Sequence, residues 1–123
     1  MFSQFAFVFG LFFLAIGVLG FVPAAAPGGM LFGYLHVNEL HNLIHIGTGV
    51  FALLAAYWKN YPVYFQIFGI VYLVIAALGL YYGDAPIFGL IANNFGDVIF
   101  HFVVSLVSLY YGFFYANESM KVT

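Results

Sequence analysis

The chain has 123 residues, of which 66% are hydrophobic and 5% are charged, and its formal net charge is −2. Soluble proteins have about 25% charged residues, so this chain cannot surround a core with a charged shell, and we expect a lipid bilayer around it. Its two basic residues exclude nucleic acid as a partner, because phosphate contacts need Lys and Arg. Because the chain has no cysteine, disulfides and thiolate ligands are excluded as well.

Four apolar stretches follow in chain order, each about long enough to cross a hydrocarbon core of roughly 30 Å as a helix. We predict these spans at about residues 2–22, 34–58, 63–82 and 93–115. Pro and Gly occur in the connections, as expected of chain breaks. The sequence therefore predicts an all-α, four-transmembrane-helix bundle that forms a single integral membrane domain over residues 1–123.

The few basic residues give an orientation. Lys59 follows the second span and Lys121 follows the fourth, on the side where both termini would lie. Because cytoplasmic loops carry an excess of Lys and Arg, we expect both termini to be cytoplasmic.

The two halves of the chain resemble each other. The stretch "FGLFFLAIGVLG" from Phe9 aligns with "FGIVYLVIAALG" from Phe68 at six of twelve positions. Further pairs match Asn38 with Asn94, His41 with Asp97, and His45 with His101. We interpret these as two tandem two-helix repeats, at about residues 1–58 and 62–115. Two spans per repeat would relate the copies by a pseudo-twofold axis along the membrane normal.

Polar residues mark one face of the second span and one of the fourth. The polar face of the second span holds Asn38, His41, Asn42, His45 and Gly49. The polar face of the fourth span holds Asn94, Asp97, His101, Ser105 and Ser108. These spacings follow the period of a helix. Polar groups in a membrane point into the bundle, because hydrocarbon leaves them without partners. We therefore expect the two faces to meet.

A metal site is one interpretation of this cluster. His41 with His45, and Asp97 with His101, are i, i+4 pairs, so each helix presents two ligands on one face. Three imidazoles and a carboxylate suit Zn²⁺, and also Fe, Cu or Mn in other geometries. The three asparagines of these faces, Asn38, Asn42 and Asn94, would then support the ligands from a second layer.

Two other interpretations use the same residues. His45 and His101 occupy equivalent positions and could ligate haem or a chlorophyll-type pigment. Alternatively, the histidines, asparagines and aspartate form a buried hydrogen-bond network, or a set of proton-carrying groups, between two helices. His36 and Glu39 lie off the shared face, and we expect them near the membrane surface.

The block "LFGYLHVNELHNLIHIGTGVFAL" resembles a family of small bacterial membrane proteins known as domain of unknown function 4383. The matching positions are Asn38, Leu40, His41, Asn42, His45, Gly47 and Gly49. The resemblance implies four spans, a bacterial inner or thylakoid-type membrane, and importance of the His/Asn block. It brings no activity with it.

These observations favour a non-enzymatic structural protein, or an accessory subunit of a larger membrane complex, with a buried His/Asp/Asn centre for which metal binding is one of the interpretations. No acid–nucleophile pair indicates an enzyme, although a bound redox metal would reopen that question. The alternatives are an oligomeric proton or ion pathway, a transporter, and a haem- or pigment-binding subunit. The expected surroundings are the lipid bilayer and either a larger complex or further copies of the chain.

Overall fold

A computed structural model describes residues 2–115 and is built mainly of helices. Its α-helices are α1 (Phe2–Leu19), α2 (Glu39–Trp58), α3 (Tyr61–Tyr82) and α4 (Phe95–Leu109). A π-helical turn, η2 (Tyr110–Tyr115), continues α4. Between α1 and α2 lie a 3-10 turn, η1 (Pro27–Gly29), and a small antiparallel pair, β1 (Met30–Leu31) and β2 (Leu35–His36). Apart from this pair, the predicted all-α architecture is confirmed.

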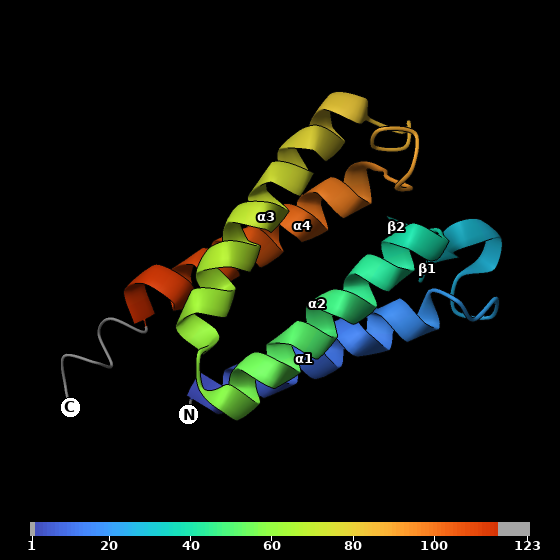
Figure 1. Cartoon of the computed structure of the whole chain (residues 1–123). Coiled ribbons are helices and arrows are strands. Elements are labelled where there is room, and N and C mark those ends of the chain that lie inside the picture. The colour runs from blue at the N-terminus through green and yellow to red at the C-terminus, as the bar shows by residue number, and fades with distance from the viewer. Residues whose placement is uncertain (1, 116–123) are drawn as a thin grey trace.

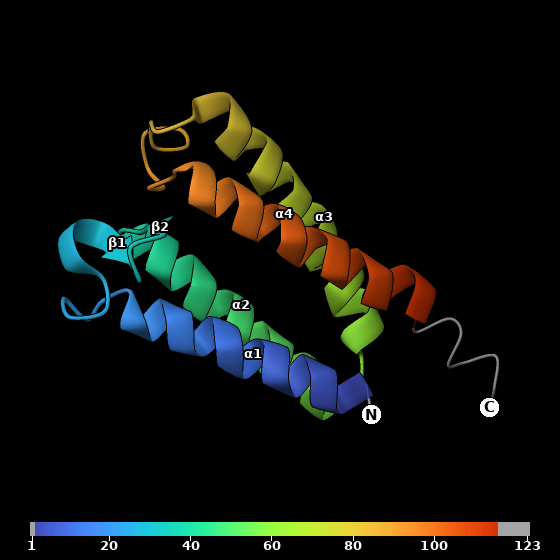
Figure 2. The same cartoon turned by 180° about the vertical axis from the view of Figure 1, so that it is seen from behind.

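The helices form two antiparallel hairpins. α1 packs against α2, and α3 packs against α4 (Figures 1 and 2). The turn between α2 and α3 lies at the same end as the N-terminus, whereas the two long connections lie together at the other end (Figure 1). Figure 1 shows α2 and α3 adjoining where they are linked, so the first hairpin leads directly into the second.

Close backbone contact holds α1 against α2. A Cβ atom at Gly10 would lie 2.8 Å from the Gly49 carbonyl oxygen, and one at Gly49 would lie 2.6 Å from the Gly10 carbonyl oxygen. Only glycine therefore fits at this crossing. Between the two hairpins, large side chains such as Phe13, Phe65 and Tyr72 are fully buried and form the apolar core.

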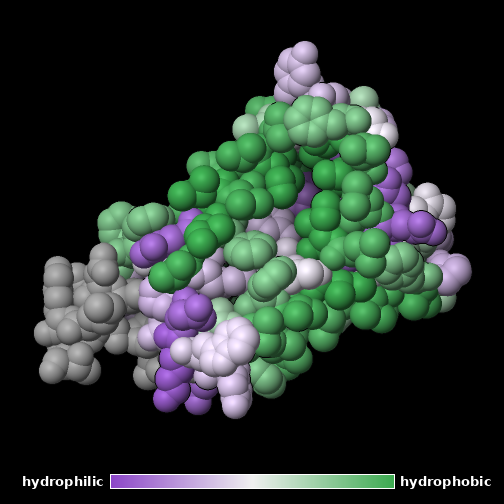
Figure 3. Space-filling model, viewed as in Figure 1, coloured by the Kyte–Doolittle hydropathy of each residue, from purple (hydrophilic) through white to green (hydrophobic). Residues whose placement is uncertain are grey.

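The outer surface is suited to lipid. Three helical segments, Glu39–Trp58, Tyr61–Tyr82 and Phe95–Tyr115, are long and apolar enough to cross a membrane, and α1 is a shorter apolar helix. Large hydrophobic side chains are exposed along all four helices. In Figure 3, hydrophobic residues cover most of the visible face, and hydrophilic ones gather toward its ends.

Several predicted boundaries were wrong. α1 ends at Leu19 rather than near residue 22, and α2 begins at Glu39 rather than near residue 34. α4 begins at Phe95 rather than at residue 93. The apolar residues before α2 instead belong to the β1–β2 pair, whose tight turn places Phe32 at φ 53° and the next glycine at φ 75°. Hydropathy alone cannot distinguish such an apolar turn from the first turn of a helix.

Candidate metal centre

Three buried imidazoles meet between the two hairpins. His41 and His45 lie one turn apart on α2, and His101 lies on α4. Their exposed fractions are 2%, 0% and 3%. One ring nitrogen from each can be chosen so that all lie within 4.8 Å of one another. The structure thus brings together three of the four predicted ligands in the form of a compact nitrogen cluster.

Asp97, the fourth predicted ligand, is fully buried in the first turn of α4. Its Oδ1 lies 3.9 Å from His41 Nε2, which is too long for a hydrogen bond. Its Oδ2 accepts hydrogen bonds from the backbone N–H groups of His36 and Asn94, both at 3.0 Å. One carboxylate oxygen is therefore anchored, and the other faces the imidazole of His41.

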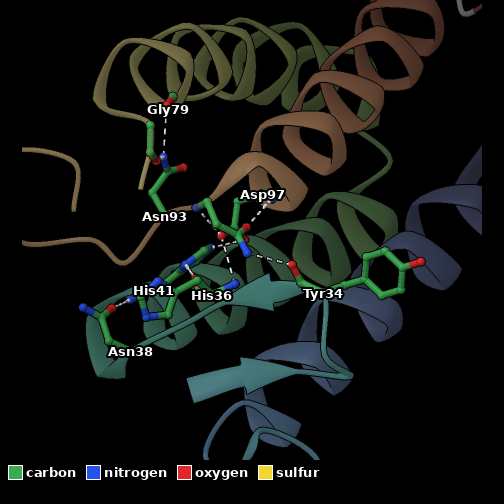
Figure 4. Close-up of polar contacts among 9 residues, drawn as sticks. Tyr34, His36, Asn38, His41, Gly79, Asn93 and Asp97 are labelled. Carbon is green, nitrogen blue, oxygen red and sulfur yellow. Dashed lines mark hydrogen bonds and ion pairs between the residues drawn. The ribbon is translucent and has the colours of Figure 1, made fainter. Parts of the chain in front are cut away.

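The backbone of His36 holds side chains from both hairpins. Its N–H donates to Asp97 on α4, and its carbonyl oxygen lies 3.0 Å from His41 Nδ1 on α2. Because a carbonyl can only accept, His41 Nδ1 carries a proton, and in the neutral imidazole Nε2 then has the free lone pair. Figure 4 shows His36 between His41 and Asp97. The sequence placed His36 outside the site, because no pattern of side-chain types reveals a backbone role.

Asn38 and Asn94 lie just before α2 and α4 and cap them, and are not residues of the helices themselves. Each side-chain oxygen accepts from the backbone N–H three residues later, at His41 and Asp97 respectively. Each side-chain amide then crosses to the opposite connection. Asn38 Nδ2 donates to the Leu90 carbonyl at 2.9 Å, and Asn94 Nδ2 donates to the Tyr34 carbonyl at 3.0 Å.

Asn42, the third asparagine assigned to a second layer, faces a different neighbour. A Cβ atom at Gly20 would overlap the Asn42 side chain, so Asn42 packs against the end of α1.

Two buried residues near the cluster were missed by the sequence analysis. Asn93 is 1% exposed, and its amide donates to the carbonyls of Gly79 and Gly83 at the end of α3. Tyr72 was also missed, and its ring centroid lies 5.4 Å from that of His101. The continuously apolar sequence around Tyr72 gave no sign of this contact.

Most of the buried side-chain polar atoms without a hydrogen-bond partner in the described part of the chain belong to the three histidines and Asp97. The buried atoms without a hydrogen-bond partner include His41 Nε2, both ring nitrogens of His45, His101 Nδ1 and Asp97 Oδ1. The expected hydrogen-bond network among these side chains is therefore not formed by these atoms. A buried polar group without a partner costs about 1–3 kcal/mol, and the three histidines of this cluster form a group that could hold a metal ion.

The space beside the imidazoles is small. A cavity of about 10 Å³ is lined by His41, Ile44, His45, Tyr72, Ile75, Ile91 and His101. That volume suits about one atom-sized guest, so a haem or chlorophyll macrocycle does not fit between His45 and His101. Neither histidine is exposed enough to ligate a pigment from the lipid side. The alternative of a haem or pigment site therefore stays a prediction that the packing around these histidines does not favour.

Comparison with known proteins gives a family. A model described as a domain of unknown function, DUF4383, matches residues 3–114. The chain belongs to this family. The DUF4383 match spans both hairpins and every residue of the cluster, and it confirms the resemblance drawn from the His/Asn block. No curated protein and no solved structure matches the chain.

Proposed function

We propose that this DUF4383 chain is a small, non-enzymatic integral membrane protein whose two helical hairpins are joined by a divalent transition-metal ion. The ion would bind His41 and His45 from the first hairpin and Asp97 and His101 from the second. The observation that carries the proposal is the convergence of unpartnered, buried imidazole nitrogens and a carboxylate oxygen. Apolar residues could have filled this space at lower cost, since a metal-free polar cluster inside a bilayer has nothing to offset its desolvation.

We further propose that all four helices cross the bilayer, with both termini in the cytoplasm. The N-terminus and the α2–α3 turn lie at the same end of the bundle (Figure 1). This is the arrangement expected if α1 and α2 each cross the bilayer once. Lys59, the first orienting lysine, ends α2 at that end, whereas Lys121 lies outside the described residues. The metal centre would then lie toward the non-cytoplasmic face, in a bacterial inner or thylakoid-type membrane.

A tandem duplication accounts for the matched geometry of the two halves. Phe32 and Phe88 have φ angles of 53° and 54°, which few non-glycine residues adopt. The glycines that follow them have φ angles of 75° and 72°. Together with the crossed asparagine contacts described above, these values support two repeats related by a pseudo-twofold axis between α2 and α4.

Metal analysis of the detergent-purified protein tests the main proposal. We expect about one transition-metal ion per chain in wild type and none after His45→Ala. A matched control is His36→Ala, because only the backbone of His36 takes part in the site. Wild-type protein that binds no stoichiometric metal, even when supplied with Zn²⁺ in chelator-free buffer, would contradict the proposal.

A second candidate function, a proton or ion pathway, has one observation in its favour. Beyond the cluster, Tyr72 Oη lies 2.8 Å from Thr48 Oγ1, and Tyr64 Oη donates to the Thr48 carbonyl at 2.8 Å. These groups extend the polar interior from the metal centre toward the opposite end of the bundle. Flux across liposomes containing wild type or His45→Ala protein is the test, and a wild-type rate equal to that of empty vesicles removes this candidate.

A further inference from the structure

We infer that the metal site is closed: the protein supplies all four ligands, in a tetrahedral Zn²⁺ site that has no position for water or substrate. This inference rests on the proposed metal binding and adds to it the identity of the ion and the nature of its coordination. It starts from Asp97, whose two carboxylate oxygens have different surroundings.

Asp97 is arranged as a single-oxygen ligand. Two backbone N–H groups hold Oδ2 at 3.0 Å each, which fixes the plane of the carboxylate. Oδ1 is buried, has no hydrogen-bond partner, and faces His41 Nε2 at 3.9 Å. Two ligand atoms about 2.1 Å from a tetrahedral ion would lie about 3.4 Å apart. A small rotation of either side chain therefore brings both atoms to ligand distance of one ion.

The imidazoles are arranged in the same manner. The carbonyl of His36 holds the Nδ1 proton of His41, so that Nε2 faces the cluster, as outer hydrogen bonds do for metal-binding histidines. Both nitrogens of His45 are unpartnered. The ligand nitrogens lie within 4.8 Å of one another. Asp97 lies outside this group of three, but its Oδ1 lies 3.9 Å from His41 Nε2 and would complete a tetrahedron by rotating toward the imidazoles.

The walls leave no room for a fifth group. The cavity beside the imidazoles measures about 10 Å³, and the aromatic rings of Phe13, Phe100 and Tyr72 pack against His45 and His101. Asn38 and Asn94 tie the two connections together next to the ligand-bearing helix ends. Catalytic zinc sites keep an open position for water, whereas structural sites are closed. This enclosure indicates a structural site.

The donor set selects the ion. Three imidazoles and one carboxylate provide nitrogen and oxygen ligands without a thiolate or thioether, which disfavours Cu⁺. Zn²⁺ accepts four-coordinate N/O sites without a geometric penalty from its d electrons. Because ligands come from both α2 and α4, the ion would act as a cross-link between the hairpins.

Co²⁺ substitution tests this inference on the full-length protein in detergent, because Co²⁺ reports the coordination of the Zn²⁺ it replaces. Chelator-treated wild type should bind one Co²⁺ and show the intense visible absorption of tetrahedral Co²⁺, unchanged by added azide. Zn²⁺ should displace the ion and abolish the bands. Weak six-coordinate bands, or a spectrum that shifts with azide, would overturn the closed site while metal binding stands. Absence of any Co²⁺ or Zn²⁺ binding would overturn the proposed function itself.

The role of Asp97 has its own test. Asp97→Asn should lower the affinity for Zn²⁺ at least about tenfold, because the amide keeps an acceptor for the backbone N–H groups but loses the charge. Asp84→Asn is the matched control, since Asp84 is an exposed acid in the connection between α3 and α4. Equal affinities in wild type and Asp97→Asn would contradict the ligand role. Should Asp97→Asn fail to fold, X-ray absorption of Zn²⁺-loaded wild type decides: four N/O neighbours at about 2.0–2.1 Å support the inference, and five or six overturn it.

Discussion

The crossed asparagines yield a prediction whose magnitude follows from their contacts. Asn38→Ala removes the cap of α2, which typically contributes about 1 kcal/mol. It also removes the hydrogen bond to the Leu90 carbonyl, which contributes about 0.5–1.5 kcal/mol. We expect a loss of about 2 kcal/mol in the free energy of unfolding. Asn94→Ala should cost a similar amount, because it makes the equivalent pair of contacts.

Two further variants separate the contributions. Asn38→Asp keeps an oxygen for the cap but loses the amide that crosses to the other connection, so it should lose only the contribution of that hydrogen bond, about 0.5–1.5 kcal/mol. Asn60 precedes α3 without a side-chain capping hydrogen bond, and Asn60→Ala should therefore change the free energy by less than about 0.5 kcal/mol.

Reversible unfolding by SDS in mixed micelles, followed by circular dichroism, measures all four variants under one condition. The metal should be removed first, so that ligand binding does not mask the difference. If Asn60→Ala destabilises the protein as much as Asn38→Ala does, the losses reflect asparagine in general, and the assignment of these particular contacts is refuted.

Three other predictions concern packing, the hydroxyl pair and the ion. Gly20→Ala should lower the free energy of unfolding by about 1–3 kcal/mol, because its Cβ would overlap Asn42. Gly47→Ala, where a Cβ meets nothing within 4 Å, should be neutral or stabilising by up to about 1 kcal/mol in the same SDS unfolding. Tyr72→Phe should cost no more than about 1 kcal/mol, since Thr48 Oγ1 keeps its hydrogen bond to a backbone carbonyl; a larger loss in SDS unfolding would contradict that reasoning. Zn²⁺ at a hundred times its dissociation constant should stabilise wild type by about 2.7 kcal/mol, and EDTA should reverse the shift in melting temperature. An identical melting temperature with and without Zn²⁺ would show that the ion does not bind the folded state preferentially.

Much of the arrangement was predictable from spacing. The helical period alone placed His41 and His45 on one face of α2, and the alignment of the halves directed that face toward His101 on α4. The structure brings these three imidazoles together. This works because few polar groups are tolerated in an apolar chain, so those present must face one another.

The connections were not predictable in the same way. The residues from Met30 to His36 are nearly all apolar, and hydropathy extended the second helix back to about residue 34. Local chemistry determines where α2 begins: Phe32 adopts a left-handed conformation, and Asn38 caps the first turn of the helix. The part played by the His36 backbone was equally hidden, because any residue type presents the same N–H and carbonyl groups.

One pair of equivalent positions breaks the match between the halves at the centre of the molecule, with His41 in one and Asp97 in the other. A divalent ion surrounded by four neutral imidazoles would retain a charge of +2 deep in a low-dielectric interior. A single carboxylate among the ligands reduces that charge to +1. Because the Born energy of burying an ion grows with the square of its charge, the substitution lowers this energy roughly fourfold. Perfect symmetry would thus be the electrostatically costlier arrangement for the proposed binding of a cation within a bilayer.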